Sequence, residues 1–283
     1  MNPTTRSLLV LHDDPVLLSR LRAAAAAYQL QHVPDWCALR ERLRAAPPSP
    51  LAVVDPYAGT RPCGGPAPQL QSLLQDFPSL TVMAALSLAR GRACDLCMLG
   101  RWGVTEVIEL DLETSVQRLH QRLANMPVHL LRDFVERRLA PAMGAHGRVI
   151  VRAAVEVVMA SGDAAALGRA VHASTRTLDR WCAEEGLPSP RRLLLWFRVL
   201  LAAELLIDAG RSTESVALAC GYNGKHALHR AFRHVLRLSP SQVRKRDPFA
   251  IASAAFLAEL SPSAPVAAAH AQLASAAALA DAA

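Results

Sequence analysis

The apolar positions of the first half of the chain fall into short runs separated by amphipathic stretches. Runs of strand length occur at Ser7–Leu11, Leu51–Asp55, Leu80–Ala85 and Glu106–Ile108, with a weaker one near Gln29–Val33. Helical spacing of apolar residues marks Pro15–Tyr28, Asp35–Ala46, Gln69–Phe77, Ala89–Gly100 and Glu113–Ala124. Strands that alternate with helices predict a parallel, doubly wound α/β sheet.

The second half has helical periodicity only, and it contains a repeat. Two pairs of segments recur at an offset of fifty residues: Leu178–Arg180 with Leu228–Arg230, and Ser189-Pro190 with Ser239-Pro240. Each copy predicts a short helix, a turn and a second, basic helix. The helices expected are Ala164–Val171 and Thr175–Glu185 in the first copy, then Thr213–Cys220 and Gly224–Arg237 in the second. This layout predicts an all-α domain with two helix-turn-helix units.

A helix between the two copies, Arg192–Ile207, is apolar on nearly all sides. Such a helix must be covered by others, so we interpret it as a stiff connector. Polar residues with short side chains stand where the neighbouring helices begin. Asp163, Ser174 and Ser212 each directly precede an expected helix, which is the position of an N-cap.

Composition shifts divide the chain into four parts. Residues 1–124 form the expected α/β domain, and 148–246 the expected double helix-turn-helix domain. Proline and glycine residues mark 125–147 as a linker. Within it, Val128–Leu139 predicts a short helix that either makes a dimer contact or packs against one of the domains. The alanine-rich, low-complexity part at 247–283 is expected to be a frayed helix or disordered, without an assigned function.

The positive charge of the chain is concentrated in the repeated part. The 283 residues carry a net charge of +7, with 16 Lys and Arg against 8 Asp and Glu from Arg148 to Arg246, and 15 against 13 in residues 1–147. Localised basic charge favours a polyanionic partner, although a solvated charged surface gives the same count. No uncharged apolar run before the tail is long enough for a membrane span, and the apolar run near the N-terminus is too short for the core of a signal peptide. We therefore expect a cytoplasmic protein.

The spacing of the six cysteines does not indicate a set of disulfide bonds. Cys94-x-x-Cys97 has no second pair at zinc-site spacing, and no histidine follows it closely. Reduced thiols in a cytosolic protein are the default expectation, and no cofactor is predicted.

Three carboxylates lie where the predicted strands end. Asp13 and Asp14 follow the first strand, and Asp55 ends the third. Because parallel strands present their carboxyl ends at one edge, these side chains are expected to lie close together and to need a divalent cation such as Mg²⁺. The alternative for Asp55 alone is a strand-end acid that caps a turn with Pro56.

Residues 7–124 resemble the receiver domain of bacterial response regulators, on Leu-His-Asp-Asp-Pro at 11–15 and Val-Val-Asp-Pro at 53–56. The resemblance implies a flavodoxin-like α/β fold in which Asp55 accepts phosphate while Asp13 and Asp14 hold Mg²⁺. Glu109–Asp111 stands where receivers carry a lysine, and Ser87 lies one place later than the expected hydroxyl. Without that lysine a phosphoaspartate lacks its main charge partner, so a receiver-shaped regulatory or dimerisation domain is favoured over a phosphorylated one.

The repeated part resembles the DNA-binding domain of the AraC/XylS family of transcription regulators. The residues that carry the resemblance are Val216-Ala217, Gly221-Tyr222, Leu228-His229-Arg230-Ala231-Phe232, Ser239-Pro240 and Arg244. The sequence departs from the family pattern at three positions. Leu228 replaces an aromatic residue, Val243 replaces Tyr or Phe, and Arg237 replaces Gly. These departures concern packing and turn geometry.

This second resemblance implies which side chains read DNA. Bases would be read by Arg176, Asp179 and Arg180 in the first copy and by Lys225, His226, His229 and Arg230 in the second. We interpret Arg233, Arg244, Lys245 and Arg246 as phosphate contacts. Several alternatives stay open: Arg180 and Arg230 can instead contact phosphate or form internal ion pairs, and Asp179 can pair with Arg176.

The sequence thus predicts a bacterial, sequence-specific DNA-binding transcription regulator with a degenerate receiver-like domain. The alternative is a two-component response regulator switched by phosphorylation of Asp55. An enzyme is disfavoured, because the cysteines are scattered and no Ser/His/Asp arrangement or phosphate-binding glycine loop is present. The expected partners are double-stranded DNA, RNA polymerase and a second copy bound through the N-terminal half, but no membrane.

Overall fold

The fold was analysed in a computed structural model. It describes residues 6–25, 28–45, 51–60, 64–87, 93–112, 115–125 and 130–260. The chain forms two compact units: Met1–His129 with Ile207–Ala219, and Leu130–Leu206 with Cys220–Ala283. In the described part of the chain, no helix is both long and apolar enough to cross a membrane.

The first unit contains a five-stranded parallel sheet. Its strands are β1 (Arg6–Leu11), β2 (Tyr28–His32), β3 (Leu51–Val54), β4 (Thr81–Leu86) and β5 (Glu106–Glu109). They are ordered β2-β1-β3-β4-β5, and the central register pairs Val10 with Val53 and Val53 with Met83. Every residue of β3 is buried. Central parallel strands are covered on both faces, and for that reason they appear in the sequence as uninterrupted apolar runs.

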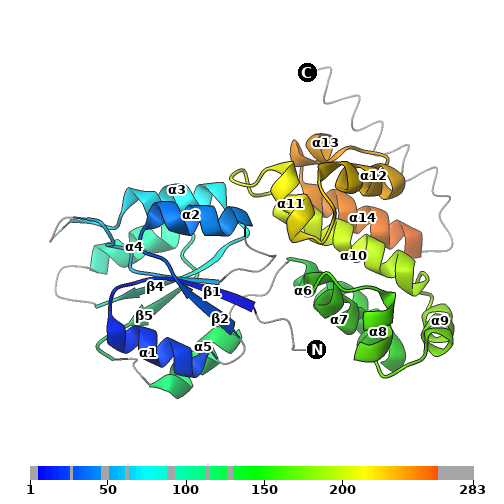
Figure 1. The fold of residues 1–283 in the computed structure, drawn as a ribbon, viewed down its shortest axis with the longest axis horizontal. Coiled ribbons are helices and arrows are strands. Elements are labelled where there is room, and N and C mark those ends of the chain that lie inside the picture. Colours follow the sequence, from blue (N-terminus) through cyan, green and yellow to red (C-terminus); the bar gives the residue numbers. More distant parts are fainter. Residues whose placement is uncertain are drawn as a thin grey trace. The chain divides into compact units, whose positions relative to one another are not determined.

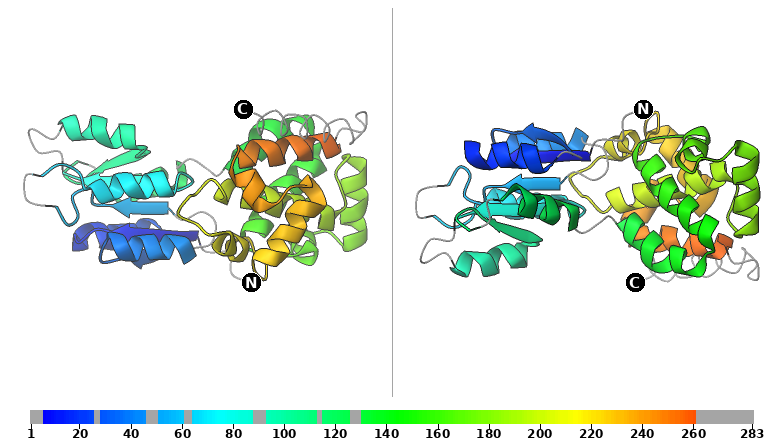
Figure 2. Two further views of the ribbon diagram at one scale, coloured as in Figure 1. Left: turned by 90° about the horizontal axis from the view of Figure 1, so that it is seen from above. Right: turned by 90° about the horizontal axis from the view of Figure 1, so that it is seen from below.

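Five helices cover the two faces of this sheet (Figures 1 and 2). They are α1 (Pro15–Ala24), α2 (Trp36–Ala45), α3 (Pro68–Asp76), α4 (Ala93–Trp102) and α5 (Val116–Asn125). Helices α2, α3 and α4 share one core with Ala52 and Val54, whereas α1 and α5 share the other with Leu51 and Val53. Successive residues of β3 thus point to opposite faces. The predicted flavodoxin-like fold is confirmed.

The second unit is helical. Its elements are α6 (Leu130–Phe134), the π-helix η1 (Val135–Leu139), the 3₁₀-helix η2 (Ala140–Ala142), α7 (Ala145–Met159), α8 (Ala164–Ala170), α9 (Thr175–Glu184), α10 (Pro190–Leu205), α12 (Lys225–Leu236), α13 (Pro240–Arg244) and α14 (Pro248–Leu260). Helix α11 (Thr213–Ala219) belongs to the first unit.

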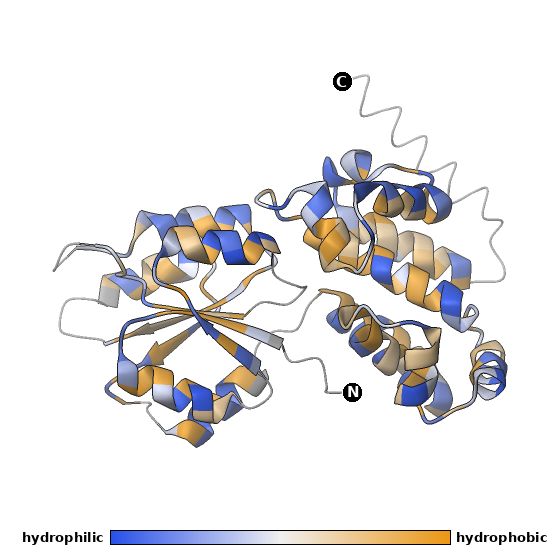
Figure 3. Ribbon diagram, in the orientation of Figure 1, coloured by the Kyte–Doolittle hydropathy of each residue, from blue (hydrophilic) through white to orange (hydrophobic). Residues whose placement is uncertain are grey.

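The connector α10 is the centre of the helical unit. Trp196 and Phe197 are fully buried, and α10 contacts α6, α7, α8, α9, α12, α13 and α14. Figure 3 shows that α10 is largely hydrophobic, whereas hydrophilic residues prevail along α12. The prediction that neighbouring helices must cover Arg192–Ile207 is confirmed for its helical part.

Part of the predicted linker packs onto the helical unit. Leu131 and Val135 are buried, and α6 contacts both α7 and α10. The buried carboxylate of Glu204 accepts hydrogen bonds from the backbone N–H groups of Leu130 (3.0 Å) and Leu131 (3.1 Å). These groups have no partner within their own helix, so Glu204 stabilises the start of α6. The sequence left two alternatives for Val128–Leu139, a dimer contact or packing against one of the domains. The described part of this segment packs against the helical unit. Residues 126–129 lie outside the described part.

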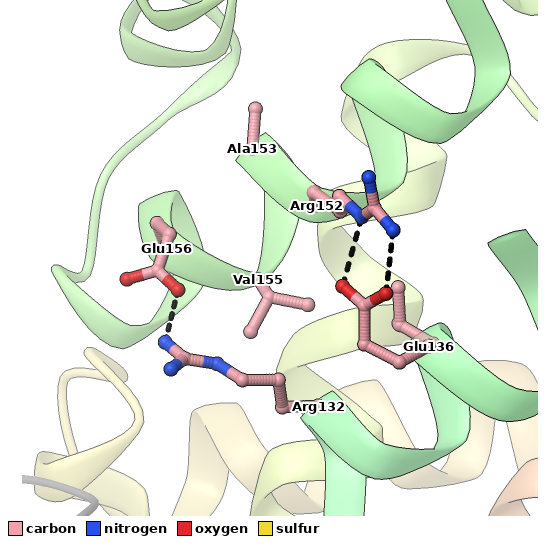
Figure 4. Close-up of a pocket in the computed structure, with 7 residues that line it drawn as sticks. Arg132, Glu136, Arg152, Ala153, Val155 and Glu156 are labelled. Carbon is pink, nitrogen blue, oxygen red and sulfur yellow. Dashed lines mark hydrogen bonds and ion pairs between the residues drawn. The ribbon is translucent and has the colours of Figure 1, made fainter. Parts of the chain in front are cut away.

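Ion pairs tie the same segment to α7 around a surface hollow of about 340 Å³ (Figure 4). Arg152 donates to both carboxylate oxygens of Glu136, at 2.8 and 2.6 Å, and Arg132 pairs with Glu156. The hydrogen bond from Arg152 lowers the pKa of Glu136. The side chains of Arg152 and Glu136 are 54% and 42% exposed, so their pair contributes little stability and mainly orients η1 on α7.

The expectation for the tail is wrong over Pro248–Leu260, which forms helix α14 packed against α10. Phe256 is fully buried, with its ring centroid 5.5 Å from that of Trp196 and 5.7 Å from that of Phe197. Arg192 donates to both oxygens of Glu259, at 2.9 and 2.8 Å. Because the segment is rich in alanine, its composition did not indicate that Phe256 would pack in the core of the helical unit. Residues 261–283 of the predicted tail lie outside the described part.

Ile207–Ala219 packs within the α/β unit, a grouping that the sequence boundaries did not include. The fully buried Asp208 accepts hydrogen bonds from the backbone N–H (2.9 Å) and the hydroxyl (2.7 Å) of Ser79 and from Nε of buried Arg211 (3.0 Å). Burial raises the pKa of Asp208, and the bonds from Ser79 and Arg211 oppose this shift. Helix α11 packs against α2 in the same unit.

Candidate nucleic-acid interface

The first helix-turn-helix consists of α8 and α9, and two side chains fix where these helices begin. The carboxylate of Asp163 accepts from the N–H of Ala166 at 2.8 Å, and Ser174 Oγ accepts from the N–H of Thr177 at 3.1 Å. Both are the N-caps that the sequence predicts. The bond from Ala166 lowers the pKa of Asp163, which keeps this cap ionised.

Helix α9 buries one face and exposes the other. Leu178 and Cys182 are buried, and burial raises the pKa of the Cys182 thiol to about 11. The predicted base-reading residues Arg176, Asp179 and Arg180 are all exposed. Arg180 also lies 3.5 Å from Glu184, one turn further along, which is one of the internal ion pairs left open above. Because both side chains are more than half exposed, this pair does not hold Arg180 strongly.

The end of α9 is anchored on the start of α7 by contacts that the sequence reasoning missed. Glu185 accepts from the N–H of Gly144 at 2.7 Å, and His146 stacks on Trp181 with ring centroids 4.3 Å apart. A Cβ atom at Gly144 or Gly147 would lie within 2.6 Å of the Glu185 carboxylate. Two glycines three residues apart at a helix start were the available signal, because this spacing permits close approach.

The second helix-turn-helix consists of α11 and α12. Ser212 Oγ accepts from the N–H of Ser215 at 3.0 Å and caps α11. Leu228 and Phe232 of α12 are buried, and burial raises the pKa of Tyr222 far above its usual range. The outward residues of α12 are exposed as predicted: Lys225, His226, His229, Arg230 and Arg233.

The two copies differ by one residue in the turn. The first helices begin 49 residues apart, at Ala164 and Thr213, whereas the second helices begin 50 residues apart, at Thr175 and Lys225. The offset of fifty therefore holds from the second helices onward, including Ser189-Pro190 and Ser239-Pro240, but not for the first helices. At the shorter offset His172 corresponds to Gly221, and both have left-handed backbones, with φ values of 52° and 75°. Glycine adopts this conformation without cost, whereas histidine is strained there.

The segment after α12 carries the remaining predicted basic residues. Arg237, which replaces a glycine of the family pattern, ends α12 with a left-handed φ of 59°. Ser239 and Gln242 form a capping box at the start of α13. Lys245 and Arg246 are exposed after this helix, whereas Arg244 is half buried. Helices α9 and α12 both contact α10, so one connector supports both candidate reading helices.

The structure does not bring Asp13, Asp14 and Asp55 together as metal ligands. No group of three His, Cys, Asp or Glu side chains in the described ranges is placed to hold a metal ion. Local turns use two of the carboxylates instead: Asp14 accepts from the N–H of Val16 at 2.8 Å and Asp55 from the N–H of Tyr57 at 2.9 Å. Asp55 thus caps the turn that follows β3, which is the alternative the sequence left open for it, and the Mg²⁺ site stays a prediction.

A polar contact occupies the edge of the sheet where the receiver resemblance expects a lysine. Ser87, after β4, donates a hydrogen bond to the carboxylate of Asp111, after β5. Two adjoining hollows of about 310 and 270 Å³ share Ser87 and Leu110; Asp14 lines the first and Asp55 the second. An acid at this edge adds negative charge where a phosphoryl group would need a cation.

Comparison with known proteins identifies the helical segment. Residues 167–246 match the family model of a helix-turn-helix domain, which confirms the predicted AraC-type domain and supports a DNA-binding transcription regulator. No curated protein matched the chain.

Two solved structures are similar at low scores. Full-length FixJ from B. japonicum is 14% identical, with 83% of this chain and 100% of that chain covered and a TM-score of 0.33. The xylose-binding transcription activator XylR is 15% identical, with 85% and 70% covered and a TM-score of 0.34.

Proposed function

We propose that this chain is a sequence-specific transcription regulator that reads DNA through α9 and α12. The observation that carries the proposal is the helix-turn-helix match over 167–246, within which each reading helix has a buried apolar face and an exposed polar one. The excess of basic residues in the same segment supplies the attraction to phosphate. We infer a binding protein rather than an enzyme.

The exposed side chains have separable roles in this proposal. Arg176 and Arg180 on α9, and Arg230 on α12, suit bidentate bonds to guanine, whereas Asp179 accepts from cytosine. Lys225, His226 and His229 complete the base-reading set, and Arg233, Arg244, Lys245 and Arg246 contact phosphate. If both helices enter one face of the duplex, their subsites lie about 10 base pairs apart, roughly 34 Å.

Arg180→Ala is expected to relax base preference at one subsite, with a loss of about 1–3 kcal/mol of discrimination there. Arg246→Ala should instead weaken binding to all DNA sequences alike, because it removes a phosphate contact. The slope of log K against log salt concentration should become shallower by about one. Selection from a random duplex library, followed by titration at several salt concentrations, measures both effects.

Glu184→Ala is the matched control for Arg180. It removes the ion-pair partner of Arg180 and leaves the guanidinium in place, so base preference should persist. An unchanged preference in Arg180→Ala, or the same change in Glu184→Ala, would rule out direct reading by Arg180.

We further propose that the α/β unit regulates or dimerises the protein without phosphorylation of Asp55. The bond between Ser87 and Asp111 and the turn held by Asp55 support this proposal. The only lysines of the chain are Lys225 and Lys245, so the α/β sequence offers none to pair with a phosphoryl group. A second copy bound through this half and RNA polymerase are the partners we propose besides DNA.

Incubation with acetyl phosphate tests the absence of phosphorylation. We expect no uptake of label by the wild type, as in the Asp55→Asn variant, because the α/β sequence has no lysine to pair with a phosphoryl group at Asp55. Label that appears on the wild type and disappears in Asp55→Asn would instead establish a phosphorylation-switched response regulator.

A further inference from the structure

Two exposed cysteines stand one turn apart at the beginning of α4. Cys94 and Cys97 are three residues apart in this helix, so their side chains lie on the same face. Both are exposed, whereas Cys182 and Cys220 are buried. Exposed thiols are accessible to oxidants, and buried ones are largely inert. The proposed DNA-binding function makes no use of this pair.

The fold places the pair in a setting that favours thiol chemistry. Helix α4 follows β4 in a parallel βα unit, and Cys94-x-x-Cys97 opens that helix. A C-x-x-C motif beside a βα unit is typical of dithiols that cycle with a disulfide. The first-turn N–H groups of a helix have no carbonyl partner within the helix, so fewer hydrogen bonds hold this turn than hold the middle of the helix.

Asp95 lies between the two cysteines and links them to the carboxyl edge of the sheet. Its carboxylate accepts a hydrogen bond from the Tyr57 hydroxyl at 2.8 Å. The backbone N–H of Tyr57 donates to Asp55 at 2.9 Å, and Tyr57 and Asp55 line the same hollow of about 270 Å³. A movement of the first turn of α4 therefore reaches Asp55 through two hydrogen bonds.

Closing a disulfide requires such a movement. Side chains three residues apart in a helix have Cβ atoms about 5–6 Å apart. A disulfide needs its Cβ atoms about 3.8 Å apart, so the turn that contains Asp95 must tighten or unwind.

We propose that Cys94 and Cys97 are a redox-responsive dithiol whose oxidation displaces Asp95 from Tyr57 and alters the hollow at Asp55. The oxidant is a hydroperoxide. One thiolate attacks the peroxide, the O–O bond breaks, and a sulfenic acid and an alcohol form. The second thiol then attacks the sulfenic sulfur, the S–S bond forms and water leaves. Two thiols lose two electrons, and the peroxide gains them.

The test uses the full chain, treated with hydrogen peroxide and then with dithiothreitol. Free thiols should fall from six to four per chain and return on reduction, and peptide mapping should find Cys94 joined to Cys97. Cys37→Ser, which removes another exposed thiol, should leave this disulfide intact, whereas Cys94→Ser and Cys97→Ser should each abolish it. Oxidation of these thiols to sulfinic acids without a disulfide, or pairing with another cysteine, overturns the proposal.

Hydrogen exchange of the Asp55–Thr60 turn tests the link to Tyr57. Exchange should become faster on oxidation of the wild type and stay unchanged in Cys94→Ser. Asp95→Ala should reproduce the faster exchange in the reduced protein, because it removes the acceptor of the Tyr57 hydroxyl. A Cys94–Cys97 disulfide that leaves the exchange of this turn unaltered refutes the coupling.

Discussion

Replacing Asp208 with alanine is expected to lower the free energy of unfolding by about 3–5 kcal/mol. The substitution removes the carboxylate that faces Arg211, whose side chain is only 1% exposed. It also removes the acceptor for the backbone N–H and the hydroxyl of Ser79. Buried donors that lose their acceptor pay the full cost of desolvation. Urea unfolding, followed by circular dichroism, measures the loss.

Two variants make the Asp208 experiment specific. Asp208→Asn keeps one carbonyl oxygen as an acceptor for Ser79 or Arg211, so a smaller loss is expected. Asp179→Ala removes an exposed acid from α9 and should change stability by about 0.5 kcal/mol or less. If Asp208→Ala behaves like Asp179→Ala, the packing of Ile207–Ala219 within the α/β unit is wrong.

The sequence predicts most of the regular structure because the forces that form it are local. Of the predicted run Leu51–Asp55, the residues Leu51–Val54 are buried and form β3, which is covered on both faces of the sheet. Asp163 and Ser174 cap the helices that directly follow them, as their positions indicate. The apolar face of a helix and its N-cap depend only on residues a few positions apart, so their pattern is visible in a single sequence.

Contacts between distant residues could not be predicted in this way. Ser79 and Asp208 are 129 residues apart, and nothing near either residue indicates the other. The strand-end acids show how local bonds add to such a pattern. Asp14 and Asp55 each accept a hydrogen bond from the backbone N–H two residues further on, which for Asp55 is the turn-capping alternative that the sequence left open. Such local bonds are common for aspartate in turns, and they compete with any assembled site.

Phe256→Ala is expected to lower the free energy of unfolding by about 3–5 kcal/mol, because it empties a site in the core of the helical unit. The Phe256 ring is fully buried between those of Trp196 and Phe197, and both of these belong to α10. Chemical denaturation of the full chain measures the loss. If this segment were an unpacked tail, the same substitution would leave the free energy of unfolding almost unchanged.

Phe249→Ala is the matched control on the same helix. Its ring packs edge-on against Phe134 at a centroid distance of 6.0 Å and is partly exposed, so about 1–2 kcal/mol is expected. Equal small losses in both variants would show that α14 does not cover α10. Since α10 supports both α9 and α12, a large loss in Phe256→Ala should also weaken DNA binding near the unfolding midpoint. Arg180→Ala, in contrast, should alter base preference without changing that midpoint, which separates support of the reading helices from reading itself.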